Sequence, residues 1–263
     1  MHASSSASPR SLRNEVSPEE WEARVNLAAC YRLVAKYGMS DLIYNHITAK
    51  VPGSQGRHFL INPFGMLYEE ITASSLYKID LDGKVVLQPE TPYGINEAGY
   101  LIHSAVHAAR PEWACVLHTH TRAGMAVSAM REGLLPLTQT AMRFFEAVGY
   151  HDYEEPVSDL SERDRIARDL GPHSVLVLRN HGLLACGRTI GAAFNTMYWL
   201  ENACKAQVDV FASGREFTLP PLELARRMAR RYGPGGETKA EFGTLEWPAL
   251  LRQLDRLDSS YRH

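Results

Sequence analysis

The sequence predicts an α/β protein in which helices cover both faces of a central, largely antiparallel sheet, giving three α/β/α layers. Short apolar segments rich in β-branched residues alternate along the chain with longer segments of helical periodicity. The 263 residues are 45% apolar and 22% charged, a composition typical of an ordinary globular domain with one sizeable core. No internal repeat divides the chain.

The helices and strands are predicted from their periodicity and their boundary residues. Ser17 and Pro18 form a capped helix start, Gly38 ends that helix, and Asp82-Gly83 is a hairpin turn. Helices are expected at 18–37, 96–109, 123–130, 160–170, 189–213, 220–232 and 247–254, and strands at 47–51, 59–61, 76–79, 85–87, 113–117 and 175–178. Residues 151–153 are expected in a loop.

Three parts of the chain are expected to differ in organisation. Residues 1–16 are rich in Ser and Ala at their start and predict a disordered arm. Residues 17–215 carry the predicted α/β/α domain. Residues 216–263 are expected to form a helical extension, packed on the same domain or on a neighbouring subunit.

Charge and cysteine usage exclude several classes of partner. The formal net charge of −2 provides no general attraction to nucleic acid or to a membrane surface. No stretch has eighteen consecutive apolar residues, and the first residues lack the apolar core of a signal peptide. The four cysteines form no C-x-x-C pair, which favours reduced thiols. We therefore expect a cytoplasmic protein whose partner is a small-molecule substrate.

The most informative motif is a pair of histidines at the end of an apolar strand. His118 and His120 are spaced i, i+2, which places two side chains on the same face of a β-strand. His181 follows a second apolar segment, 175–178, where a turn should begin. Three neutral imidazoles that converge from strand ends would bind a divalent transition metal and leave coordination positions open for substrate.

Three segments together resemble the class II aldolase/adducin superfamily. They are the helical segment 96–111, which contains His103 and ends in Arg-Pro, the strand segment 116–121, and the Asn-His-Gly-Leu segment within 178–183. The resemblance covers roughly residues 20–215. Residues 133–137 and 149–153 are more similar to the adducin branch than to the sugar-phosphate aldolases.

The resemblance implies a metal site and a reaction. His118, His120 and His181 match the three histidines that hold Zn²⁺ in the aldolases, so a divalent ion is the expected cofactor, Zn²⁺ foremost and Fe²⁺ or Mn²⁺ as alternatives. The family reaction is a retro-aldol cleavage through a metal-stabilised enediolate. The resemblance also implies a homotetramer with sites near the subunit boundaries.

The sequence also departs from the aldolase pattern. In the aldolases a Glu that serves as metal ligand and proton-transfer group lies four residues before the helix histidine, whereas this chain has Gly99 there. Without that Glu, the proton would move through Glu97, a tyrosine of a neighbouring subunit or metal-bound water, and Glu97 is the candidate catalytic residue. Asn45 and Gly65 match residues on the phosphate side of the aldolase site, but the carboxylate of Glu97 would repel a phosphate dianion.

Three functions are compatible with these residues. The first is a metal-dependent lyase that performs aldol cleavage or decarboxylation of a small, non-phosphorylated oxo or hydroxy compound through an enolate. The second is a non-haem Fe(II) oxygenase acting on a 2-oxo acid, since three histidines with open positions also suit Fe²⁺. The third is a non-catalytic, adducin-like assembly domain.

Overall fold

The computed structural model describes residues 10–154, 160–234, 236–237 and 243–263. Its α-helices are α1 (Pro18–Lys36), α2 (Glu97–Ala109), α3 (Arg122–Ala129), α4 (Gln139–Met142), α5 (Leu160–Leu170), α6 (Ile190–Ala212), α7 (Leu222–Tyr232) and α8 (Glu246–Leu257). Its strands are β1 (Ile47–Lys50), β2 (His58–Ile61), β3 (Tyr77–Asp80), β4 (Val85–Leu87), β5 (Cys115–Thr119), β6 (Gly149–His151), β7 (Val175–Leu178) and β8 (Gly182–Gly187). Short 3₁₀ helices cover Tyr68–Glu70, Ala73–Ser75 and Ser260–Arg262.

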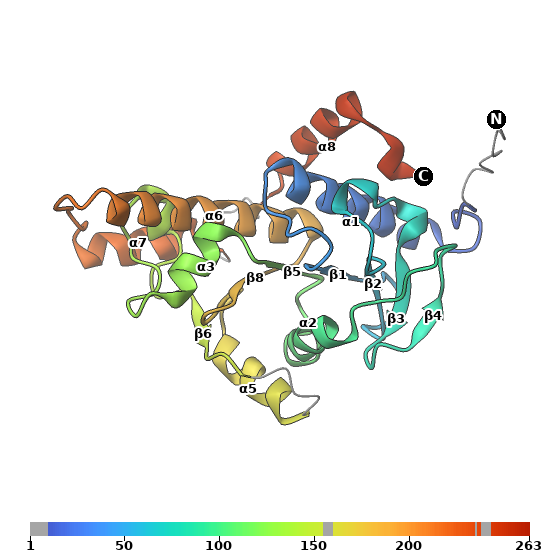
Figure 1. Cartoon of the computed structure of the whole chain (residues 1–263), viewed down its shortest axis with the longest axis horizontal. Coiled ribbons are helices and arrows are strands. Elements are labelled where there is room, and N and C mark those ends of the chain that lie inside the picture. The colour runs from blue at the N-terminus through green and yellow to red at the C-terminus, as the bar shows by residue number, and fades with distance from the viewer. Residues whose placement is uncertain (1–9, 155–159, 235, 238–242) are drawn as a thin grey trace, which may run out of the picture.

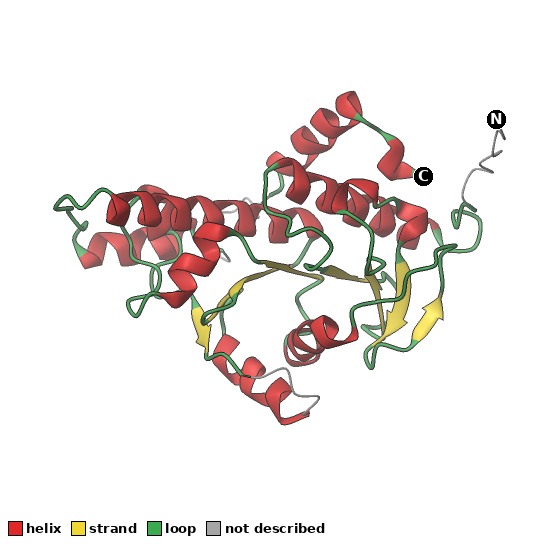
Figure 2. Ribbon diagram, viewed as in Figure 1, coloured by secondary structure: helices red, strands yellow, loops and turns green. Residues whose placement is uncertain are grey.

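The strands of the described residues form one sheet in the order β4-β3-β2-β1-β5-β8-β7-β6. Each neighbouring pair is antiparallel except β6 and β7, which are parallel. Helices α1, α6 and α8 lie on one side of the sheet, and α2 and α5 lie on the other (Figure 1; Figure 2). The predicted three-layer fold with a largely antiparallel sheet is confirmed.

The alternation of side chains along the strands produces two cores, one on each face of the sheet. Cys115 and Leu117 of β5 belong to the core under α1 and α6, together with Phe194 and Leu200 of α6. Val116 belongs to the opposite core under α2 and α5. His118 is two residues after Val116, so its side chain lies on the face of the sheet that α2 covers.

Two strands were not predicted from the sequence. The expected loop at 151–153 is wrong at His151, because residues 149–151 form β6 and pair in parallel with β7. Here Nδ1 of His151 lies 2.8 Å from Oδ2 of Asp169, which fixes the ring against α5. Strand β8 was missed because its apolar residues directly follow the turn at His181, with glycine at both of its ends.

The two ends of the chain pack on the domain where the structure describes them. The disordered arm expected at 1–16 is corrected for residues 10–16: Leu12 is 1% exposed and its backbone N–H donates to Oγ of Ser74. Residues 1–9 lie outside the described residues. Leu254 of α8 and Tyr261 belong to the same core as α1, so this part of the C-terminal extension packs on its own domain.

Among the described residues, no helix combines the length and the apolarity that a membrane crossing requires.

Candidate metal centre

Three histidines converge where β5 and the β7–β8 hairpin end. His118 is in β5 and His120 follows that strand directly, while His181 lies in the turn between β7 and β8. The register pairs His118 with Leu184 and Thr119 with Leu183, so the beginning of β8 lies beside the end of β5. Pairing of the strands therefore brings together residues that are about sixty positions apart in the sequence.

The turn that carries His181 depends on its two neighbours. Asn180 has a φ of 56°, in the left-handed region that Asn tolerates better than most residues. A Cβ at Gly182 would lie 2.3 Å from the backbone oxygen of Thr119, so only glycine permits this close approach of β8 to β5. The Asn-His-Gly sequence is thus required by the backbone that presents the imidazole.

His120 is fixed by the start of the next helix. Thr121 is the N-cap of α3, and its side chain accepts a hydrogen bond from the backbone N–H of Gly124. The Thr121 hydroxyl also donates to Oε2 of the buried Glu201 in α6. The cap at Thr121 fixes the backbone between the end of β5 at Thr119 and the start of α3. It therefore holds His120, which lies between them, where its Nε2 faces those of His118 and His181.

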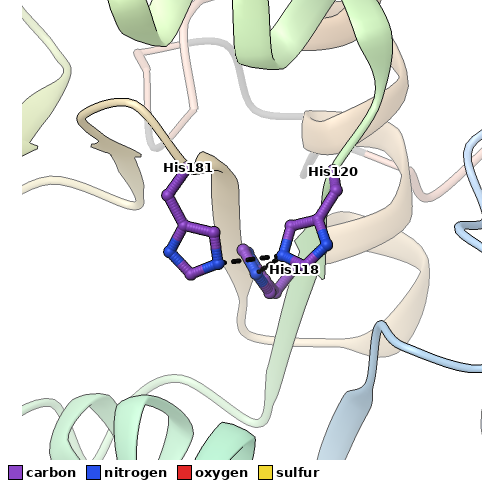
Figure 3. Close-up of side chains that lie close together, drawn as sticks. All are labelled: His118, His120 and His181. Atoms are coloured by element: carbon purple, nitrogen blue, oxygen red, sulfur yellow. Dashed lines mark hydrogen bonds between the residues drawn. The ribbon is translucent and has the colours of Figure 1, made fainter. Parts of the chain in front are cut away.

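The three rings place their Nε2 atoms within reach of one ion (Figure 3). Nε2 of His120 lies 2.8 Å from Nε2 of His118 and 2.9 Å from Nε2 of His181. One ligand nitrogen from each of the three rings lies within 4.8 Å of the others. Two nitrogens bound to one Zn²⁺ at about 2.0–2.1 Å would be roughly 2.9–3.4 Å apart, so the observed separations match neighbouring ligands of a single ion.

The hydrogen bonds of the outer ring nitrogens define the tautomers. Nδ1 of His118 lies 2.9 Å from the carbonyl oxygen of Leu183, and Nδ1 of His120 lies 3.1 Å from Oδ2 of Asp41. A carbonyl and a carboxylate only accept, so both Nδ1 atoms must donate, and in the neutral rings Nε2 carries a lone pair. Two lone pairs facing each other at 2.8 Å repel unless a cation lies between them, so these residues fit a divalent metal ion.

Burial keeps two of these rings in the neutral form that binds metal. The pKa of His118 lies well below its usual value, first because of burial and then because of the charges of His120, His181 and His46. Burial also lowers the pKa of His181 to about 4, and His120 adds to this shift. At neutral pH both rings therefore offer lone pairs without first losing a proton.

Two residues at this site were missed by the sequence reasoning. Asp41 is an acid in a loop before β1, and no local pattern connects it with His120. His46 is 3% exposed, and its ring centroid lies 5.9 Å from that of His118. Its sequence signal is its position next to Asn45, a candidate substrate-binding residue.

The other predicted site residues have different surroundings. Asn45 is 1% exposed, and neither its Oδ1 nor its Nδ2 has a hydrogen-bond partner within the described part of the chain. The rings of Tyr44 and Phe64 lie 6.1 Å apart, which brings the segments of Asn45 and Gly65 side by side. Gly65 has a φ of 130°, and a Cβ there would lie 2.5 Å from the Tyr93 ring, so packing and backbone conformation also require this glycine.

The predicted catalytic Glu97 is the first residue of α2. Its side chain lies outside the part of the chain that the structure describes. Its role remains a prediction.

Fold and cluster together define a three-layer α/β protein with a candidate three-histidine metal centre. The family described as Class II Aldolase and Adducin N-terminal domain matches residues 25–208. The chain belongs to this class II aldolase and adducin family.

Similar proteins include members of both branches. A Pseudomonas aeruginosa protein, provisionally named as an aldolase class 2 protein, is 47% identical over 97% of each chain. Rat alpha-adducin is 46% identical, and the match covers 89% of this chain and 33% of the adducin. Among solved structures, an aldolase II superfamily protein from Pseudomonas syringae is 47% identical with a TM-score of 0.90, and the match covers 97% of this chain and all of that one. L-fuculose 1-phosphate aldolase from Glaciozyma antarctica is 27% identical with a TM-score of 0.81 over 93% of each chain.

Proposed function

We propose that the protein is a metal-dependent lyase of the class II aldolase type. The observation that carries this proposal is the convergence of three Nε2 atoms, two of which are held as lone-pair donors by Leu183 and Asp41. Family membership and the resemblance to L-fuculose 1-phosphate aldolase support it. The reaction is aldol cleavage or decarboxylation of a small oxo or hydroxy compound.

The proposed ligands are His118, His120 and His181, and Zn²⁺ is the proposed metal, with Fe²⁺ and Mn²⁺ as alternatives. When bound, the ion would supply Lewis acidity toward the carbonyl and hydroxyl oxygens of the substrate and stabilise the enolate charge. The protein's own contribution is to keep His118 and His181 neutral through burial and to fix the tautomers of His118 and His120. Asp41 fixes the tautomer of His120, and the carbonyl oxygen of Leu183 fixes that of His118.

Asn45 is the proposed substrate-binding residue. A buried amide whose oxygen and nitrogen both lack a partner among the described residues costs stability in the free protein, so a polar ligand gains from pairing with it. An amide can donate to a carbonyl oxygen and accept from a hydroxyl group, the two groups of an oxo or hydroxy substrate. Gly65 is proposed as a second contact, through its backbone.

Glu97 is proposed as the group that transfers the proton. Glu97 is the first residue of α2, whereas Gly99, two residues later, has no ionisable side chain. A carboxylate at this place would also disfavour a phosphorylated substrate. Glu97→Gln keeps the shape of the side chain and should abolish turnover while the metal content stays at the wild-type level.

The test of the proposal begins with metal content. The protein is purified anaerobically, and its metal is measured by plasma mass spectrometry beside His118→Ala and the control His173→Ala, a partly buried histidine outside the cluster. We expect about one equivalent of divalent metal in the wild type and in the control, and loss of the metal in His118→Ala. Metal-loaded wild type is then assayed for aldehyde or CO₂ release from a panel of 2-oxo and hydroxy acids. If the wild-type protein contains no metal, even after reconstitution, the proposed metal-dependent lyase activity is refuted.

An oligomer with sites near the subunit boundaries is part of the proposal. The specific expectation is a homotetramer, which light scattering on the same preparation would show as a mass of about 118 kDa, four times the 29.4 kDa of the chain.

A non-catalytic assembly role is the second candidate. It is favoured by the 46% identity with rat alpha-adducin, which is close to the 47% identity with the Pseudomonas aeruginosa relative named for an aldolase. Metal-loaded protein that turns over no compound of the panel would favour this role.

A further inference from the structure

His46 is a buried imidazole that lies between the candidate metal centre and helix α2. Its ring centroid lies 4.1 Å from that of His103 in α2 and 5.9 Å from that of His118 in β5. The ring centroids of the three candidate ligands are 4.5 to 4.8 Å apart, closer than His46 is to His118. His46 is therefore placed directly behind the ligands and is not one of them.

The ring on the far side of His46 is itself fixed. Nδ1 of His103 lies 2.8 Å from Oγ1 of Thr48 in β1, and the same hydroxyl lies 2.8 Å from Nε2 of His107. These groups are buried as well. His46 thus cannot move away from His118 without disturbing a hydrogen-bonded group between α2 and the sheet.

Gly99 closes the third side of His46. A Cβ at this position would lie 2.5 Å from Cε1 and 2.9 Å from Nδ1 of His46. Gly99 is the third residue of α2, and its φ is outside the left-handed region, so the backbone does not require glycine here. Alanine is the better helix former at such a position, so the reason for glycine is the close approach of the imidazole.

The buried His46 side chain is also incompletely paired. Its Nε2 is buried and has no hydrogen-bond partner among the residues that the structure describes. A ring held there without full hydrogen bonding must be kept by packing, and the packing comes from Gly99, His103 and His118.

We propose that His46 is a positioning residue for the metal ligand His118, and that it has its place because position 99 carries no side chain. The proposal rests on the metal site of the proposed function. A side chain at position 99 pushes His46 toward His118, since His103 blocks the opposite direction. The pair His46 and Gly99 therefore sets the position of one ligand without touching the metal.

The test is a double-mutant cycle on the full chain with Co²⁺ as the probe. The variants are Gly99→Ala, His46→Ala and the double substitution, and Gly94→Ala is the matched control because its Cβ would meet no atom within 4 Å. The readouts are Co²⁺ affinity, measured by competition with a chelator, and the visible absorption spectrum of the bound ion. The thermal midpoint of each metal-free variant reports whether it folds.

We expect Gly99→Ala to weaken Co²⁺ binding at least tenfold and to change the spectrum, and Gly94→Ala to stay within twofold of wild type. The double variant should bind as tightly as His46→Ala alone, because the added methyl group has nothing left to displace. If Gly99→Ala does not fold, the comparison of the double variant with His46→Ala decides the question.

Two results would overturn the inference while leaving the metal site intact. The first is wild-type Co²⁺ affinity and spectrum in Gly99→Ala. The second is a loss of Co²⁺ affinity in the double variant that equals the product of the losses in the two single variants. A wild-type protein that binds no Co²⁺ would instead refute the proposed function, and the inference with it.

Discussion

Replacing Asp41 with alanine should weaken metal binding, although this residue is not one of the proposed ligands. Its Oδ2 accepts the hydrogen bond from Nδ1 of His120 and so holds Nε2 of that ring as a lone-pair donor. Removing such a partner typically costs 10–100-fold in metal affinity. The Asp41 side chain is 43% exposed, so water screens its charge and replaces part of the bond. We therefore expect the lower limit, about tenfold, which corresponds to about 1.4 kcal/mol.

The size of the loss should depend on what replaces the carboxylate. Asp41→Asn removes the charge but keeps an oxygen that can accept from Nδ1 of His120, so its loss should lie between those of wild type and Asp41→Ala. The assay is a competitive titration of Zn²⁺ against a chelator of known affinity at pH 7. Asp82→Asn is the matched control, since Asp82 is an exposed acid in the turn between β3 and β4, away from β5 in the strand order.

Asp41 would have no role in metal binding if Asp41→Ala bound Zn²⁺ as tightly as wild type. Its role would also be refuted if Asp82→Asn caused an equal loss, because the effect would then come from net charge and not from the tautomer of His120.

Two further predictions concern stability. Burial lowers the pKa of His46 to about 4 and that of His107 to about 3, both below the value of about 6.5 in the unfolded chain. The unfolded state therefore binds more protons as the pH falls below about 6.5, so stability present at pH 7 is lost toward pH 4. Denaturant unfolding of the metal-free protein should show a loss of about 2 kcal/mol per histidine between pH 7 and pH 5, and equal stability at both values would contradict this. Gly182→Ala places a Cβ 2.3 Å from a backbone oxygen that cannot turn aside, so its free energy of unfolding should fall by about 2 kcal/mol or more. Gly94→Ala, with open space around the new methyl group, should change it by less than about 0.5 kcal/mol, and similar values for the two variants would show that the close approach at Gly182 is relieved by relaxation.

Local signals were sufficient for most of the fold. The capped start at Ser17 and Pro18 predicted α1, and the structure has the helix at Pro18–Lys36 with the Ser17 side chain accepting from the N–H of Glu20. Strands β1, β2, β3, β4 and β7 lie within a few residues of their predicted ranges. Strand β5 is shifted by two residues, so that His118 is part of the strand and His120 follows it.

The two missed strands show where local signals end. β6 has three residues, too few for a periodic pattern, and it exists because β7 provides a parallel edge for it. β8 begins at a glycine that the sequence pattern assigns to a turn, and the turn does end there. Whether the next residues form a strand depends on pairing with β5 and β7, which residues near them in the sequence do not report.

The sequence by itself determined the α/β class and most of the elements, and it predicted the three histidines proposed as ligands, because periodicity, caps and the motif at each strand end are local properties. Only the tertiary structure decided that Asp41 bonds to His120 and that His46 lies between His103 and His118. These contacts join residues 57 to 79 positions apart, and strand order, register and close packing create them. Gly99 is an example of this difference. The sequence shows only that a carboxylate is missing at this position, whereas the folded chain shows that the His46 imidazole occupies the space beside it.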